Sequence, residues 1–83
     1  MNIPVEEQRA RIRAFVVNDL VGEPDLELRD DEGIFSSGLS DSFSAVRFLA
    51  FLTTQFGVPA DGVRIEDLDT VAKCLVLVEK RAR

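Results

Sequence analysis

The sequence predicts an all-α protein, a bundle of three main helices and one short helix with a long loop between the first two. Three segments carry apolar residues three and four positions apart, which is the spacing of an amphipathic helix. No segment shows the sustained alternation of apolar and polar residues that is typical of a strand. With 83 residues, 46% of them apolar and 30% charged, we expect a single globular domain over residues 1–83.

The first predicted helix covers residues 5–21. Gly22 and Pro24 end it, and the residues from 22 to 41 have no helical period. Its apolar stripe is Ile12, Phe15, Val16 and Leu20. A loop this long in a small domain is usually functional or disordered. Spaced apolar residues favour a loop pinned to the core: Leu26, Leu28, Ile34, Phe35 and Leu39.

The second predicted helix covers residues 42–56. Asp41 is a good N-cap, and Gly57 with Pro59 marks the end. Its core face is Ala45, Phe48, Leu49, Leu52 and Phe56.

Two further helices follow. A short turn or helix is expected at 63–68, and Asp69 or Thr70 can cap the last helix. Four residues share the core face of that last helix: Val71, Cys74, Leu75 and Val78. On this face Cys74 is expected to be a small buried hydrophobe.

The composition argues against an enzyme. The chain has no histidine, so a Ser-His-Asp triad, a Cys-His pair and an imidazole metal ligand are excluded. One cysteine cannot form an intramolecular disulfide or a cysteine cluster for zinc or iron–sulfur. Five serines lie between positions 36 and 44, but no internal base can activate them.

Negative charge is concentrated in one segment. The chain has a net charge of −5, and residues 21–41 carry seven acidic residues against one arginine. This segment would be repelled by phosphate backbones and anionic lipid, so neither nucleic acid nor a membrane is expected as a partner. The alternative interpretation is a solvated loop without a partner. No apolar run approaches the roughly 20 residues of a membrane span and no secretory signal is seen, which predicts a cytoplasmic protein.

The residues around Ser42 carry a family resemblance. Gly38 precedes the sequence Asp41-Ser42-Phe43, where the long loop meets the second helix. With Phe35 before the glycine, the helix end at 55–59 and the threonine-capped last helix, this order resembles the acyl and peptidyl carrier protein family. The resemblance covers nearly the whole chain, and it departs from the usual pattern in having Phe43 where leucine is commoner.

The resemblance implies a fold, a cofactor and partners. The fold would be an acyl-carrier-protein-like four-helix bundle with a short third helix. A phosphopantetheinyl transferase would attach 4′-phosphopantetheine to Ser42, and Asp41 would help to orient that transferase or its magnesium as well as capping the helix. Ser42 is expected beside free backbone N–H groups and the positive end of the helix dipole, which favour a phosphate. The arm would carry an acyl or aminoacyl group as a thioester between a loading enzyme and a downstream synthase or transferase.

The second helix lacks the acidic residues that fatty-acid carriers place there. Residues 42–56 contain no acid, and four residues fall off the core stripe: Phe43, Val46, Arg47 and Ala50. An exposed apolar surface usually marks a partner, so these residues are the predicted partner-binding surface. We therefore expect a free-standing, monomeric carrier for polyketide, nonribosomal peptide or related specialised biosynthesis. The alternative is a helical adaptor that binds a partner through the same surface with no covalent cofactor.

Overall fold

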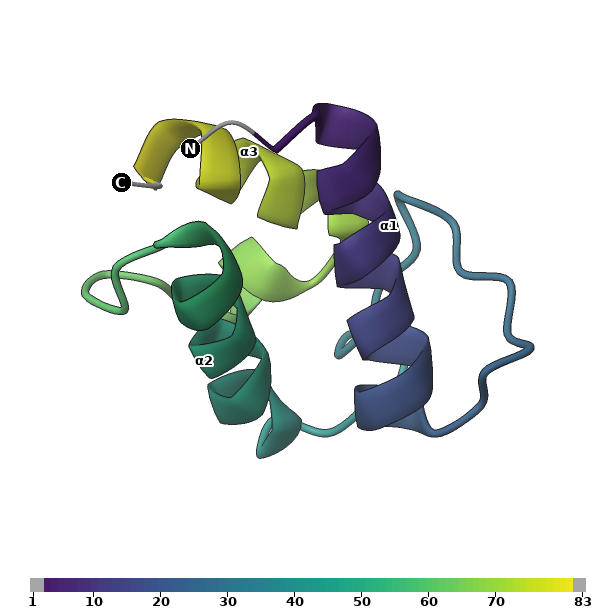
Figure 1. Cartoon of the computed structure of the whole chain (residues 1–83). Helices are drawn as coiled ribbons and strands as arrows, with labels where there is room; N and C mark the ends of the chain where they lie inside the picture. The colour runs from purple at the N-terminus through teal and green to yellow at the C-terminus, as the bar shows by residue number, and fades with distance from the viewer. Residues whose placement is uncertain (1–2, 82–83) are drawn as a thin grey trace.

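Every regular element in the described part of the chain is a helix. The computed structural model describes residues 3–81, and no strand occurs among them. The elements, in chain order, are α1 (Val5–Phe15), η1 (Val16–Val21), α2 (Ser44–Phe56), η2 (Ile65–Leu68) and α3 (Val71–Arg81) (Figure 1). The predicted all-helical class is therefore confirmed.

The first helix has the predicted extent but changes its geometry near the end. α1 continues directly into η1, which is a π-helix, and Gly22 ends the pair with a φ of 79°. A π turn is wider than an α turn, so the side-chain positions after Phe15 no longer follow the α period. As a result Val17 is buried as well as Val16, although Val17 lies off the predicted stripe.

The start of the second helix corrects the prediction by two residues. α2 begins at Ser44 rather than at Ser42. The N–H groups of Ser44 and Ala45 bond to carbonyls three residues back, those of Asp41 and Ser42, at 3.1 and 3.2 Å. Bonds of that span make a turn tighter than an α turn. The helix ends at Gly57 with a φ of 71°, as predicted.

The segment after α2 contains a short helical turn and then the last helix. The sequence predicts a short turn or helix at 63–68. The structure has a 3₁₀ helix of four residues, η2, within that range. The hydroxyl of Thr70 accepts a hydrogen bond from the N–H of Lys73 at 3.0 Å. Thr70, and not Asp69, therefore caps α3 with its side chain.

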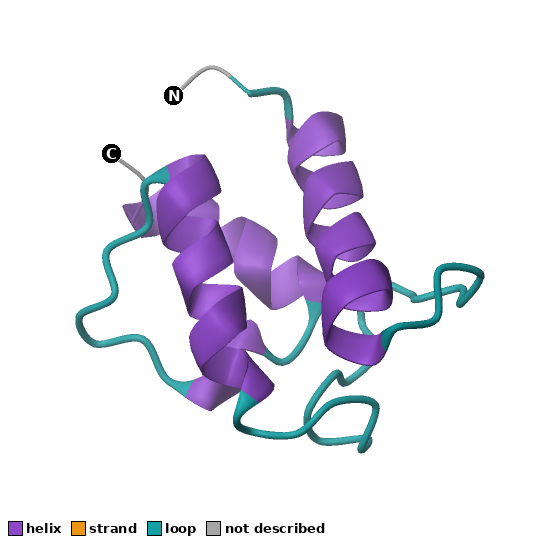
Figure 2. Ribbon diagram, turned by 60° about the horizontal axis from the view of Figure 1, so that its bottom comes forward, coloured by secondary structure: helices purple, strands orange, loops and turns teal. Residues whose placement is uncertain are grey.

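The long connection between η1 and α2 is a loop without regular structure (Figure 2), and apolar side chains and hydrogen bonds attach it to the rest of the molecule. Its predicted apolar anchors all reach the core, with Leu28 and Ile34 buried and Leu26, Phe35 and Leu39 partly buried against the core cluster. Two backbone hydrogen bonds join it to the start of α3. The carbonyl of Asp30 accepts from Ala72 N–H at 2.9 Å, and Ile34 N–H donates to the carbonyl of Asp69 at 2.6 Å.

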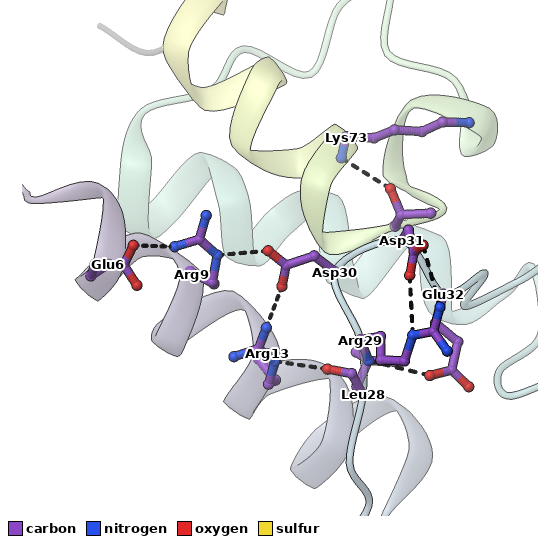
Figure 3. A network of polar contacts seen from close by, with 10 residues as sticks. Glu6, Arg9, Arg13, Leu28, Arg29, Asp30, Asp31, Glu32 and Lys73 are labelled. Atoms are coloured by element: carbon purple, nitrogen blue, oxygen red, sulfur yellow. Dashed lines mark hydrogen bonds and ion pairs between the residues drawn. The ribbon is translucent and has the colours of Figure 1, made fainter.

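Ion pairs fasten the same connection to α1 (Figure 3). The carboxylate of Asp30 accepts hydrogen bonds from Arg9, at 2.7 Å, and from Arg13. Arg13 also donates to the carbonyl of Leu28 at 2.9 Å. Hydrogen bonds to Glu6 and Asp30 raise the pKa of Arg9. Part of the acidic segment is thus neutralised within the molecule.

The core is apolar and rich in phenylalanine. Phe15 and Phe51 stack with ring centroids 4.2 Å apart, and Phe48, Phe56 and Phe35 extend this cluster. The buried residues are Ile12, Val16, Val17, Leu28, Ile34, Ala45, Phe48, Leu52, Phe56, Val58, Leu68, Val71, Cys74, Leu77 and Val78. None of the helices within residues 3–81 combines the length and the apolar character needed to cross a bilayer.

Candidate functional site

The Ser42 side chain is exposed in the turn that leads into α2. Five serines gather in this region, and four of their hydroxyls donate hydrogen bonds within the protein. The acceptors are the carboxylate of Asp69 for Ser36, the carbonyl of Gly33 for Ser37, the carbonyl of Leu20 for Ser40 and the carboxylate of Asp41 for Ser44. Among residues 3–81 the Ser42 hydroxyl has no such partner, so it differs from its neighbours in being free to react.

Asp41 lies immediately before Ser42 and is also exposed. Its Oδ1 atom accepts hydrogen bonds from the N–H of Ser44, at 3.2 Å, and from the Ser44 hydroxyl, at 3.3 Å. This is the predicted capping role, although the regular helix begins only at Ser44. The Oδ2 atom accepts no hydrogen bond from the described residues.

The backbone around Ser42 has both bonded and open N–H groups. Those of Ser44 and Ala45 are bonded within the turn, whereas those of Ser42 and Phe43 donate to no acceptor among residues 3–81. The dipole of the 13-residue α2 still has its positive end here, and no acidic residue lies in its first turn. The free N–H groups expected beside Ser42 are therefore those of Ser42 and Phe43, and the helix dipole also favours a negative group here.

The loop before Ser42 is held in place by Asp69. Its Oδ1 atom accepts from Phe35 N–H at 2.8 Å and Ser36 N–H at 2.9 Å, and its Oδ2 atom accepts from the Ser36 hydroxyl at 2.6 Å. Burial alone would raise the pKa of Asp69. The hydrogen bonds from Ser36 and Phe35, with the positive charge of Lys73, outweigh burial and lower this pKa.

Gly33 lies against the same hydrogen-bonded group, and a residue with a Cβ atom at this position would displace the Ser36 hydroxyl. A Cβ atom at Gly33 would lie 2.2 Å from the Ser36 hydroxyl oxygen and 3.3 Å from Asp69 Oδ2. The role of Asp69 was missed in the sequence, where it was considered only as a helix cap. The pair Asp69-Thr70 could have indicated this role. One helix needs only one side-chain cap, so the other residue of the pair is available for a different contact.

One side of α2 presents apolar side chains to solvent. Phe43 is 85% exposed and Val46 is 74% exposed, and Arg47 and Ala50 are exposed beside them. These four residues, here called the α2 face, were predicted to lie off the core stripe, and they do. Phe43 is the one phenylalanine of six that is outside the aromatic cluster.

Cys74 is buried in α3, as predicted. Its thiol lies 3.7 Å from the carbonyl of Leu68. Burial, with a further contribution from the charge of Asp69, raises the pKa of Cys74 to about 12. The thiol therefore stays protonated at neutral pH and is a packing residue rather than a nucleophile.

The sequence matches no model of a known protein family and no curated protein.

Proposed function

We propose that this protein is a discrete acyl or peptidyl carrier protein that bears 4′-phosphopantetheine on Ser42. The observation that carries the proposal is the exposed Ser42 hydroxyl, which has no hydrogen-bond partner among residues 3–81, next to the Asp41 carboxylate at the start of α2. The proposed fold is the four-helix bundle of that family, with η2 as its short third helix. The proposed setting is polyketide, nonribosomal peptide or related specialised biosynthesis, in the cytoplasm and as a monomer.

The residues around Ser42 fit a phosphate ester. Ser42 is exposed, the positive end of α2 is adjacent, and Asp41 Oδ1 accepts hydrogen bonds from Ser44. The arm ends in a thiol, which supplies the attachment point for an acyl or aminoacyl group as a thioester. The chain must also keep Ser42 exposed and the preceding loop in place. Asp69 holds that loop through its hydrogen bonds with Phe35 and Ser36.

In the attachment step this chain would supply only the nucleophilic hydroxyl of Ser42 and the carboxylate of Asp41. The Ser42 hydroxyl would form an O–P bond to the phosphate of the pantetheine half of coenzyme A while the pyrophosphate bond breaks. Adenosine bisphosphate leaves, and the hydroxyl proton passes to a base of the transferase. Asp41, through its Oδ2 atom, would orient the transferase or its magnesium.

An adaptor without a covalent cofactor remains a second candidate. The exposed Phe43 and Val46 favour it, because an apolar surface can bind a partner whether or not Ser42 is modified. The two candidates differ in whether Ser42 accepts the arm.

Intact-mass analysis after incubation with a broad-specificity phosphopantetheinyl transferase, coenzyme A and magnesium tests the proposal. We expect one arm on the wild type and none on Ser42→Ala. Ser37→Ala is the matched control, because it removes a neighbouring serine whose hydroxyl is bonded to the carbonyl of Gly33, and it should accept the arm. A folded wild type that stays unmodified contradicts the carrier proposal and favours the adaptor. An arm on Ser42→Ala would move the site to another residue.

A further inference from the structure

Asp69 binds three consecutive backbone N–H groups of the loop that precedes Ser42. The Ile34 N–H donates to its carbonyl oxygen at 2.6 Å, and the N–H groups of Phe35 and Ser36 both donate to its Oδ1 atom, at 2.8 and 2.9 Å. The Ser36 hydroxyl donates to its Oδ2 atom at 2.6 Å. Asp69 lies between η2 and α3, so this part of the loop is fixed by a residue outside it.

A single peptide unit joins this contact to the residues just before Ser42. The unit consists of the Ile34 carbonyl and the Phe35 N–H. Its N–H donates to Asp69 Oδ1 at 2.8 Å, and its carbonyl accepts from the Ser40 N–H at 3.0 Å. Because a peptide unit is planar and rigid, a shift of its N–H also moves its carbonyl. The backbone at Ser40, two positions before Ser42, is therefore held by Asp69 through one intervening peptide unit.

Among residues 3–81, few other directional contacts fix the backbone on this side of Ser42. The turn at residues 41–43 is exposed and is closed by its own local hydrogen bonds. Leu39 is partly buried against the core, but apolar packing has no preferred direction. The direction in which the chain enters the turn thus depends on the hydrogen bonds of Ser40, one to the peptide unit described above and one from its hydroxyl to the Leu20 carbonyl at 3.4 Å.

We infer that Asp69 is a positioning residue for Ser42 in the attachment of the arm. Its carboxylate holds the loop in the conformation in which the transferase takes up the Ser42 hydroxyl. Among the described residues Asp69 makes no hydrogen bond to Ser42, so it acts only through the loop. The inference rests on the proposed carrier function.

The expected kinetic effect is on KM. Asp69→Ala removes the acceptor of three hydrogen bonds, and the partly buried Phe35 N–H can then bond to water only if the loop shifts. If the transferase binds one loop conformation, the apparent dissociation constant is the intrinsic one divided by the fraction of molecules in that conformation. A competent fraction of about one fifth or less therefore raises KM about fivefold or more. The value of kcat changes little, because Ser42 has the same place once the complex has formed.

The test measures KM and kcat for arm transfer by a broad-specificity transferase, with coenzyme A and magnesium, for wild type, Asp69→Ala, Asp69→Asn and Thr70→Ala. Thr70→Ala is the matched control, because it removes the hydroxyl that accepts from the Lys73 N–H and caps α3. It destabilises the adjacent position without removing a hydrogen bond from the loop. We expect KM to rise about fivefold or more in Asp69→Ala, less in Asp69→Asn, which keeps one acceptor oxygen, and less than about twofold in Thr70→Ala.

Amide hydrogen exchange gives a readout that does not depend on the transferase. The Ser40 N–H should exchange faster in Asp69→Ala than in Thr70→Ala, because the peptide unit that binds it has lost its support. The amide of Leu52, in the middle of α2, should instead follow the global stability of each variant. Urea unfolding establishes that each variant is folded, and Asp69→Asn is the milder variant on which the inference is tested if Asp69→Ala does not fold.

The possible outcomes separate the inference from the carrier proposal. A KM of the folded Asp69 variants equal to that of Thr70→Ala overturns the inference and leaves the carrier proposal standing. A loss confined to kcat also overturns it, because the transferase would then bind whatever the conformation of the loop. A folded wild type that accepts no arm overturns both proposals.

Discussion

Asp69 holds three hydrogen bonds from the loop that precedes Ser42, although it lies 27 positions later in the chain. It accepts from two backbone N–H groups and one hydroxyl, so the loss of its carboxylate would leave the partly buried Phe35 N–H and the two exposed donors of Ser36 without this acceptor. Its pKa is lowered in the folded protein by these bonds despite the opposing effect of burial. The loop around Ser36 therefore depends on the ionised form of one side chain.

We predict that Asp69→Ala lowers the free energy of unfolding at pH 7 by about 1–3 kcal/mol, the cost of leaving such donors unpaired. Asp69→Asn should cost less, since the amide oxygen can still accept from Phe35 and Ser36. A carboxylate with a lowered folded-state pKa stabilises the protein above its unfolded pKa, and that stabilisation is lost as the pH falls through the folded-state value. The difference between wild type and Asp69→Asn should therefore be full at pH 7 and shrink below about pH 4.

Urea unfolding followed across this pH range measures the difference. Asp25→Asn is the matched control, because Asp25 is an exposed loop residue that receives no hydrogen bond from the described residues. A pH-independent difference for Asp69→Asn would show that the amide fails sterically and that charge has no part.

At the scale of one element, α2 has two opposite sides with different tasks. Phe48, Leu52 and Phe56 are completely buried, whereas Phe43 and Val46 are largely exposed. The buried side holds the molecule together, and the exposed side is left for a partner. The same residue type, phenylalanine, occurs on both sides, which permits a direct comparison.

Phe48→Ala should lower the free energy of unfolding by about 3–5 kcal/mol, because it removes a fully buried aromatic ring and leaves a cavity. Phe43→Ala should change it by less than about 0.5 kcal/mol, as is usual for surface substitutions. Thermal melts followed by circular dichroism compare the two. A melting temperature of Phe48→Ala within a few degrees of wild type would contradict the burial of Phe48.

Some of these features could be predicted from the sequence, and others could not. The buried side of α2 follows from the spacing of its apolar residues, because one face of a regular helix repeats every three to four positions. The π geometry of η1 and the tight turn at Ser42 depend on which carbonyl each N–H selects, and residue type does not reveal that choice. The link from Asp69 to Ser36 joins residues 33 positions apart, and no local pattern predicts such a pairing.

For the candidate site, the position of Ser42 and the off-core location of the α2 face were predictable. Ser42 was predicted from the resemblance of Asp41-Ser42-Phe43 to the carrier protein family, and the α2 face from the helical period. Five serines lie within nine positions, and four of them donate hydrogen bonds within the described residues. The sequence could not predict that Ser42 would be the one without a partner there.

Over the whole molecule, Asp30 connects elements that are distant in the chain. Its carboxylate binds Arg9 and Arg13 of α1, and its carbonyl accepts from Ala72 in the first turn of α3. The stretch of the connection from Leu28 to Ser40 is thereby attached to α1 on one side and to α3 on the other. Among residues 3–81, the stretch from Glu23 to Glu27 is attached only through Leu26 and the hydrogen bond from Glu23 N–H to the carbonyl of Val17, and its other side chains are exposed.

The difference in attachment between residues 28–40 and residues 23–27 predicts where a protease cleaves the folded chain. A protease must draw several residues of an extended segment into its active site, so it cleaves where few contacts must be broken first. We predict that a glutamate-specific protease cleaves the native protein first after Glu27, and only later after the half-buried Glu32. The bond after Glu23 is not a candidate, because Pro24 follows it. Mass spectrometry of the earliest fragments measures the order, and early cleavage after Glu32 would contradict the attachment through Asp30. The same short stretch is then the place where a tag or a label can be inserted without disturbing the helix that begins beside Ser42.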